Sequence, residues 1–179
     1  MLRRLVVNGA WRIAAVRSLT MPAIHYEMLD SMTAMAQRGS LPDSLRSLLL
    51  RMRLAVASDS ELKQHFTQHE AGFQQLADRF QSENNLLALD VDQHYDGAFS
   101  DSMSRSALLT SMRHLGIGAL TREPSHPQCE FLRIGNTQRG DLGYIFAVDA
   151  CRIPVATLDD EFTYVEQITP MWYVYKRIN

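Results

Sequence analysis

The sequence predicts an α+β fold in which an N-terminal helical hairpin and a long amphipathic helix precede a C-terminal antiparallel sheet of about four strands. As far as residue 115, apolar residues recur every three or four positions, which is the period of amphipathic helices. After residue 128, apolar and polar residues alternate, which is the period of strands. Within the helical region three phenylalanines share one helical stripe, and such a stripe needs a broad apolar partner, most naturally the face of a sheet.

Length and composition favour one globular domain. The chain has 179 residues, of which 46% are hydrophobic and 21% charged, as in ordinary folded proteins. A chain of this length buries enough surface to fold without a metal ion or a disulfide. Its net charge of −2 gives no reason to expect nucleic-acid binding, and no apolar run approaches the ~20 residues of a membrane span.

The charge is distributed unevenly along the chain. All 18 basic residues except Lys63 and Lys176 are arginines. Residues 1–57 hold eight arginines against three acidic residues, a net charge of +5, so residues 58–179 carry −7. This difference, together with the lack of predicted strands before residue 58, predicts a helical N-terminal segment (1–57) that is separable from an α+β domain (58–179).

The first twenty residues combine an apolar stretch with four arginines. These are Arg3, Arg4, Arg12 and Arg17. Apolar residues at helical spacing place the arginines opposite an apolar face, which is typical of a helix that docks on a surface or a partner. A degenerate export signal and a start site assigned too far upstream are the other two interpretations. The chain is therefore cytoplasmic as it stands, and periplasmic or envelope-associated if this stretch directs export.

Two short helices are predicted between residues 20 and 57. The first carries apolar residues at three- and four-residue spacing until Gly39, and the second carries a similar stripe that ends near Ala57. The methionines of the first stripe are Met28, Met32 and Met35. Methionines are usually adaptable core filler, although methionine-rich faces also serve promiscuous partners. The tight connection between the two stripes predicts a helical hairpin.

A long helix over 59–81 is predicted to organise the core. Ser58 and Glu61 have the spacing of a capping box, which marks a helix start. The phenylalanines of its apolar stripe are Phe66, Phe73 and Phe80. We expect these three rings to lie on a sheet formed mainly by residues 128–178.

The rest of the chain supplies one more helix and the strands. Residues 82–103 are polar and acidic and predict a linker with one short strand or turn. Ser104 opens a helix that Gly116 ends. A hairpin with its turn at 135–140 follows, and the last two predicted strands cover 162–168 and 171–178.

One histidine pair has the spacing of metal ligands. His65 and His69 are four residues apart on the predicted long helix, so both rings can face one ion. With a carboxylate from the acidic stretch 90–101 they define an alternative function, a small metal-dependent hydrolase. A zincin carries glutamate directly after its first histidine, where this chain has Phe66, and no third ligand is evident. Two helix-surface histidines are the simpler interpretation, so we assign no catalytic residue, no cofactor and no metal ligand.

The two cysteines lie near the open end of the predicted hairpin. Cys129 and Cys151 are 22 residues apart, and a hairpin that turns between them brings both to the same end. A disulfide is then sterically possible in an oxidising compartment. Reactive thiols and buried apolar residues are the alternatives.

Residues 58–179, two-thirds of the chain, carry a loose pattern of aromatic and polar positions. It consists of Phe66-Thr67-Gln68-His69, Phe73, Leu76, Phe80, Ser104-Arg105, Gly143-Tyr144 and the terminal Trp172-Tyr173-Val174-Tyr175. This pattern resembles small uncharacterised bacterial proteins, often lipoprotein-like, that end in a short W-Y-x-Y strand. The resemblance implies a helix packed on an antiparallel sheet and an envelope location, and it implies no activity. The chain departs from it by lacking a lipobox cysteine and by carrying residues 1–57.

These features predict a non-enzymatic binding or protein-interaction module of unknown specificity. The four N-terminal arginines would attract an acidic protein partner, and Met28, Met32 and Met35 would supply an adaptable apolar face. The competing interpretation is intramolecular, with the basic helices docked on the acidic remainder of the chain. No nucleic-acid partner is expected, and the oligomeric state is not predicted.

Overall fold

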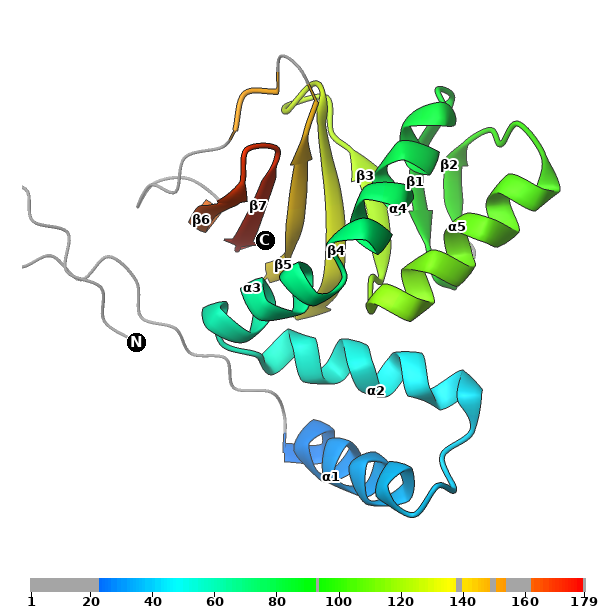
Figure 1. Cartoon of the computed structure of the whole chain (residues 1–179), viewed down its shortest axis with the longest axis vertical. Coiled ribbons are helices and arrows are strands. Elements are labelled where there is room, and N and C mark those ends of the chain that lie inside the picture. The colour runs from blue at the N-terminus through cyan, green and yellow to red at the C-terminus, as the bar shows by residue number, and fades with distance from the viewer. Residues whose placement is uncertain (1–22, 93, 138–139, 149–150, 154–161, 179) are drawn as a thin grey trace, which may run out of the picture.

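Seven antiparallel strands form one sheet in the computed structural model, in the order β2-β1-β3-β4-β5-β7-β6 (Figure 1). The structure describes residues 23–92, 94–137, 140–148, 151–153 and 162–178. The strands are β1 (Leu86–Asp90), β2 (Tyr95–Gly97), β3 (Ala119–Arg122), β4 (Cys129–Thr137), β5 (Gly140–Ala147), β6 (Phe162–Thr169) and β7 (Trp172–Arg177). The helices are α1 (Ala23–Gln37), α2 (Asp43–Val56), α3 (Asp59–Gln68), α4 (Glu70–Ser82) and α5 (Ser102–Leu115). The predicted α+β class is confirmed.

The sheet is larger than the predicted four strands. Strands β4 to β7 are those that alternation predicted, whereas β2 and β3 were not expected and β1 lies where one short strand or turn was expected. These three additional strands have five residues or fewer. So few positions show almost no period, which explains why the sequence pattern missed them.

The predicted helix 59–81 is two helices, because it breaks at His69. The His69 amide donates to Phe66 O rather than to the carbonyl four residues earlier. Its own ring nitrogen Nδ1 donates to that carbonyl, His65 O, at 2.9 Å. The side chain therefore replaces the missing backbone bond. The apolar stripe of α3 continues along α4, whose Phe73 and Phe80 are buried like Phe66. The capping box of Ser58 and Glu61 is present as predicted.

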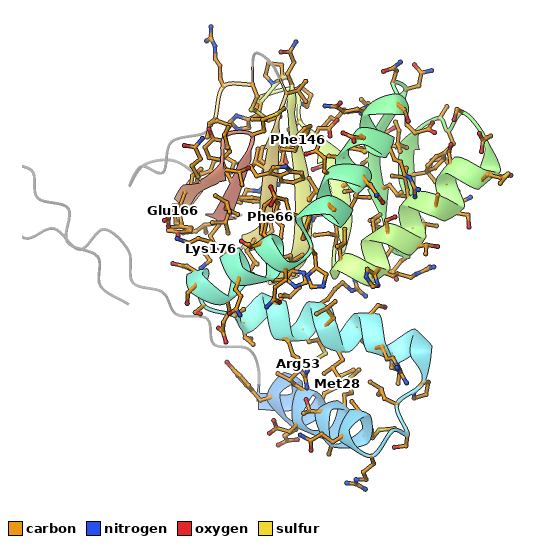
Figure 2. All side chains as sticks on the ribbon, viewed as in Figure 1. Met28, Arg53, Phe66, Phe146, Glu166 and Lys176 are labelled. Atoms are coloured by element: carbon orange, nitrogen blue, oxygen red, sulfur yellow. A yellow bond between two sulfur atoms is a disulfide. The ribbon has the colours of Figure 1, made fainter. Side chains whose placement is uncertain are left out.

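The three phenylalanines of α3 and α4 are fully buried against the sheet, as predicted. The Phe66 ring lies 5.0 Å from Trp172, and the Phe73 ring lies 4.8 Å from Tyr144. Figure 2 shows Phe66 directed from α3 into the space between the helices and the strands. Aromatic pairs at these separations add to the stabilisation that burial provides, so this layer is the centre of the main core.

The opposite face of the sheet is also covered, in a second and smaller cluster. Cys129, Phe131, Ile145, Phe162 and Tyr175 are buried there. Leu132, Tyr144 and Phe146 belong instead to the main core, so the predicted alternation of faces in the β4–β5 hairpin is confirmed. A disulfide joins Cys129 to Cys151 and holds the segment after β5 against this second face.

The only two lysines of the chain attach α3 to the last two strands. Lys63 on α3 pairs with Glu166 on β6 at 2.5 Å, and Lys176 on β7 pairs with Asp59 at the start of α3. Figure 2 places Glu166 and Lys176 together at this edge of the molecule. Tyr164 donates to the same Glu166 carboxylate. These contacts fix α3 across β6 and β7.

Helix α2 belongs to the main core, although residue 57 was the predicted domain boundary. Leu54 and Ala57 lie in the main core, and Leu50 packs against it. Gly116, which ends α5 with φ +70°, leaves room for this packing, because a Cβ there would lie 2.7 Å from Leu54 Cδ1. Removal of residues 1–57 would uncover this surface, so we do not expect residues 58–179 to keep their full stability alone.

Candidate functional site in the helical hairpin

Helices α1 and α2 form the predicted hairpin through a short turn at Gly39. This glycine has φ +70°, a conformation that residues with a side chain rarely adopt. Ser40 then donates to Met35 O through both its amide and its hydroxyl, at 3.0 and 3.1 Å. These bonds satisfy a carbonyl at the end of α1 and reverse the chain into α2.

The hairpin has a small core of its own. Its buried members are Met32, Leu41 and Leu49, and the partly buried side chains around them are Leu29, Met35, Leu45, Leu48 and Met52. Figure 1 shows α1 beneath α2, on the side away from the sheet. The main contacts of α1 are therefore with α2, whereas α2 also packs on β4 and α5.

The structure separates the three methionines that were predicted to form one docking face. Met28 is 41% exposed, Met32 is 4% exposed, and Met35 lies partly buried beside it. Tyr26, one turn before Leu29, is 43% exposed. Tyr26 and Met28 are thus exposed near the start of α1, whereas Met32 packs inside the hairpin. Arg3, Arg4, Arg12 and Arg17 lie outside the described residues.

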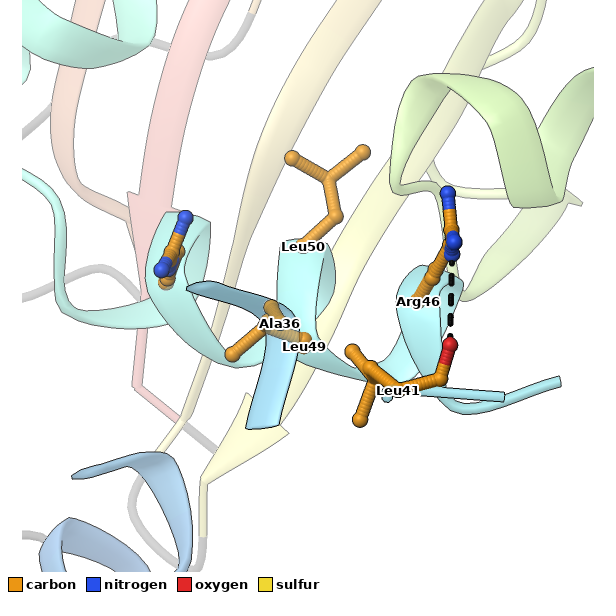
Figure 3. Close-up of a pocket in the computed structure, with 6 residues that line it drawn as sticks. Ala36, Leu41, Arg46, Leu49 and Leu50 are labelled. Carbon is orange, nitrogen blue, oxygen red and sulfur yellow. Dashed lines mark hydrogen bonds between the residues drawn. The ribbon is translucent and has the colours of Figure 1, made fainter. Parts of the chain in front are cut away.

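A groove of about 200 Å³ runs along the hairpin (Figure 3). Its described lining consists of Ala36, Leu41, Arg46, Leu49, Leu50 and Arg53. Leu41 and Leu49 form a floor that the hairpin core holds in place, since both are buried in it. The groove thus combines an apolar floor with two guanidinium groups and, among these lining residues, has no carboxylate.

Local hydrogen bonds position the two arginines of the groove. Arg46 Nε donates to Leu41 O at 3.4 Å, a bond drawn in Figure 3. Arg53 Nη2 donates to Thr33 Oγ1 of α1 at 3.1 Å. A guanidinium has five N–H groups in a rigid fork, so Arg53 can hold α1 and still serve a carboxylate. In the sequence both residues contribute only to the basic excess of residues 1–57, although their spacing around Leu49 and Leu50 was the available signal.

The histidines that suggested a metal site make bonds to the backbone instead. His65 Nε2 donates to Leu115 O at 3.0 Å, and His69 Nδ1 donates to His65 O. Burial lowers the pKa of His65, although the Leu115 carbonyl opposes that shift and the nearby His69 adds to it. His114 contacts the His69 ring at 6.3 Å between centroids. Within the described part of the chain, no three His, Cys, Asp or Glu residues are arranged to hold a metal ion.

The acidic stretch 90–101 uses its carboxylates locally. Asp90 accepts hydrogen bonds from the His94 amide at 3.0 Å and from the His94 ring at 3.2 Å. Asp101 is the N-cap of α5 and accepts from the Ser104 amide at 2.7 Å. These bonds explain Asp90 as a turn former and Asp101 as a helix cap.

A second surface groove, of about 320 Å³, lies between α4 and α5. Its described lining is Arg79, Met103, Ser106, Ala107, Thr110 and Ser111. Small and hydroxylated side chains dominate it, and Met103 at its rim is 81% exposed. It lacks the buried leucine floor of the hairpin groove, so the hairpin groove is the better candidate for a binding site.

Comparisons with known proteins supply no relative for this site. No protein-family model, no curated protein and no solved structure matches the chain. In the residues that the structure describes, no helix has the length and apolar character needed to cross a membrane. The resemblance to lipoprotein-like bacterial proteins stays a prediction, and the function is argued from the geometry.

Proposed function

We propose that this protein is a non-enzymatic interaction module that binds a partner protein through the α1–α2 hairpin. The observation that carries the proposal is the hairpin groove, with its leucine floor and its two arginines. Interfaces concentrate their affinity in a buried apolar anchor surrounded by polar groups, and arginine is among the residues enriched there. The sheet and its three covering helices act as the scaffold that holds the hairpin.

The position of α1 supports this role. The beginning of α1 exposes Tyr26 and Met28, each by more than two-fifths, and α1 lies next to the groove-bearing α2. Figure 2 shows Met28 and Arg53 in this hairpin, apart from the aromatic layer around Phe66. Tyrosine and methionine supply large contact areas that adapt to a partner. We infer that the partner contacts the exposed start of α1 as well as the groove.

The disulfide favours an oxidising compartment for this interaction. Structural disulfides such as Cys129–Cys151 persist in the periplasm, at cell surfaces and in secreted proteins, and are rare in the cytosol. An envelope or extracellular location agrees with the resemblance to lipoprotein-like proteins. The partner that we propose is therefore an envelope or extracellular protein.

Site-specific photo-crosslinking in the native host tests the proposal. A photoreactive phenylalanine analogue is placed at Met28 on α1, and a matched one at Met103 on α5, which is even more exposed. We expect a discrete adduct with a second protein from position 28 and none of that mass from position 103. The proposal is wrong if position 28 gives no adduct, or if both positions give the same one.

A further inference from the structure

The disulfide attaches a short segment of chain, residues 151–153, to the second face of the sheet. The side chains of Cys151 and Ile153 pack against the buried cluster on that face. Within the described residues, the backbone N–H groups of the segment make one hydrogen bond, from the Cys151 amide to Val148 O at 2.8 Å. That bond closes a local turn and does not reach the sheet. The covalent link from Cys151 to Cys129 is therefore the strongest attachment of the segment.

The two cysteines differ in their access to solvent. Cys129, the first residue of β4, is 1% exposed, whereas Cys151 is partly exposed. Thiol–disulfide exchange begins when a thiolate attacks one of the two sulfur atoms, so its course depends on which sulfur can be reached. An external thiolate can approach Cys151, and Cys129 Sγ is then the leaving group.

Strand pairing holds the rest of the sheet independently of this link. Strand β4 pairs with β5 from Cys129 opposite Ala147 to the far end of the hairpin. Strand β6, which follows the segment in the chain, pairs with β7 along its length and is joined to α3 by the ion pair of Lys63 and Glu166. The main core lies on the opposite face. Opening the disulfide therefore releases a cover on the second face and leaves the sheet and the main core in place.

We propose that the Cys129–Cys151 disulfide is a redox modification site, which a dithiol reductant opens at Cys151 to release residues 151–153 from the second face of the sheet. The reduced segment keeps the packing of Ile153 and one turn, and it gains conformational entropy on leaving. Arg152 O lies 3.5 Å from Cys129 Sγ, but a thiol is a weak donor and does not replace the covalent bond.

The exchange is balanced in atoms and electrons. The first thiolate of the reductant bonds to Cys151 Sγ, the S–S bond breaks, and its electron pair goes to Cys129 Sγ. The second thiolate of the reductant then attacks the reductant's own sulfur in this mixed disulfide and expels the Cys151 thiolate. The two protein thiolates take up the two protons that the dithiol gave up. The reductant leaves as a disulfide, and oxidation of the protein restores the starting state.

Methyl NMR of the full-length protein tests the release. The δ1 methyl groups of isoleucine are labelled, and spectra are recorded before and after reduction with dithiothreitol, with a soluble gadolinium chelate as a probe of access. Ile153 lies on the segment, Ile145 belongs to the second cluster, and Ile134 belongs to the main core. Ile145 and Ile134 are matched reporters, because both are 0% exposed and they lie on opposite faces.

Reduction should affect the two faces differently. We expect the Ile153 methyl to move to its random-coil shift and the relaxation enhancement at Ile145 to rise at least about threefold, because local opening exposes the second face. The Ile134 signal should stay unchanged. The variant Cys129→Ser/Cys151→Ser should resemble the reduced protein with or without dithiothreitol, since the chain has no other cysteine.

A monothiol locates the point of attack. Brief treatment with glutathione, an acid quench and peptide mass analysis should find at least about tenfold more mixed disulfide on Cys151 than on Cys129. Equal modification of the two cysteines, or modification mainly of Cys129, would overturn the proposed access.

The NMR outcomes decide the rest. The inference is wrong if Ile145 and Ile153 keep their oxidised signals in the reduced protein, because the segment then stays packed without the bond. It is also wrong if Ile134 becomes accessible together with Ile145, since the disulfide then holds the whole fold rather than one cover. Reduced wild type is sufficient for both decisions if the double variant does not accumulate. None of these measurements involves the α1–α2 hairpin, so their result is independent of the proposed partner binding.

Discussion

The aromatic core and the helical hairpin differ in how many buried contacts stabilise them. The core buries Phe66, Phe73, Tyr144 and Trp172 in mutual contact between two helices and the sheet. Among the side chains that the structure describes, three are buried in the hairpin core, and α1 packs mainly on its neighbour α2. Regions with few buried contacts open locally at low free-energy cost, whereas a dense core opens only when the whole protein unfolds.

This difference suggests that the core provides stability and the hairpin provides adaptability. The core keeps α2 at a fixed place, because Leu54 and Ala57 are part of it. Under the proposed function, α1 would adjust on this fixed base when the partner binds. The predictions below test whether stability resides in the core and adaptability in the hairpin, in order of decreasing effect.

The largest effect is expected at Phe73. Phe73→Ala removes a fully buried ring from the centre of the aromatic core and should lower the free energy of unfolding by about 3–5 kcal/mol. Urea denaturation followed by tryptophan fluorescence measures this loss, because Trp172 contacts the same ring. An unchanged denaturation midpoint would show that the core does not depend on this layer.

Loss of the disulfide should come next. Cys129→Ser/Cys151→Ser releases a link that spans 22 residues, and links of this order contribute about 3 kcal/mol. Denaturation of the wild type with and without reductant provides the matched measurement, and a thiol assay in denaturant without reductant should find no free cysteine. Equal midpoints with and without reductant would contradict the prediction.

The free energy of unfolding should depend on pH through Glu130, which lies at the edge of the core. Burial raises the pKa of Glu130 to about 7, against hydrogen bonds and charge from Arg122 that favour the ionised form. The Arg122 guanidinium also donates to Phe80 O and Leu86 O and so stays fixed at the end of α4. The folded state therefore holds a proton on Glu130 in a pH range where the unfolded chain has lost it.

The sign of the pH effect follows from this shift. A carboxyl whose pKa is raised in the folded state stabilises the fold below pH 4.5, and this contribution is lost as pH rises through about 7. The wild type should lose up to about 3 kcal/mol relative to Glu130→Gln between pH 4.5 and 8. Denaturation of both proteins across this range measures the difference. Parallel pH profiles would exclude the buried proton.

The smallest effects are expected in the hairpin. Met32→Ala should lower the local stability of α1 by about 2 kcal/mol, since Met32 is buried against Leu41 and Leu49. Met28→Ala, at an exposed position on the same helix, should change it by less than about 0.5 kcal/mol. Hydrogen exchange of the α1 amides distinguishes the two variants. Equal exchange would mean that α1 is not held by the hairpin core.

Long periodic elements were predictable from the sequence, and short ones were not. The phenylalanine stripe and the alternating strands β4 to β7 repeat their pattern over many positions. The break at His69 leaves the apolar period intact, so the pattern contains no sign of it. Strands β2 and β3 are too short to show alternation and are defined by pairing with distant neighbours.

The candidate site was only partly predictable for a related reason. The hairpin and its basic, methionine-rich character follow from local sequence, but the side on which each residue lies depends on packing. Met32 is buried beside Leu41 and Leu49, whereas Met28, four residues earlier on the same helix, is 41% exposed. Arg46 and Arg53 line a common groove only after α1 and α2 pack together, so the local sequence pattern does not single them out.

Because of where the two lysines lie, chemical labelling of their amines can report on the packing of α3. Lys63 and Lys176 carry the only side-chain amines for an amine-selective acylating reagent, and both are paired across the contact between α3 and the last two strands. The Lys63 side chain is 33% accessible, and that of Lys176 only 13%. The ratio of their labelling rates therefore reports whether α3 is packed on these strands, and the arginines do not react with the reagent.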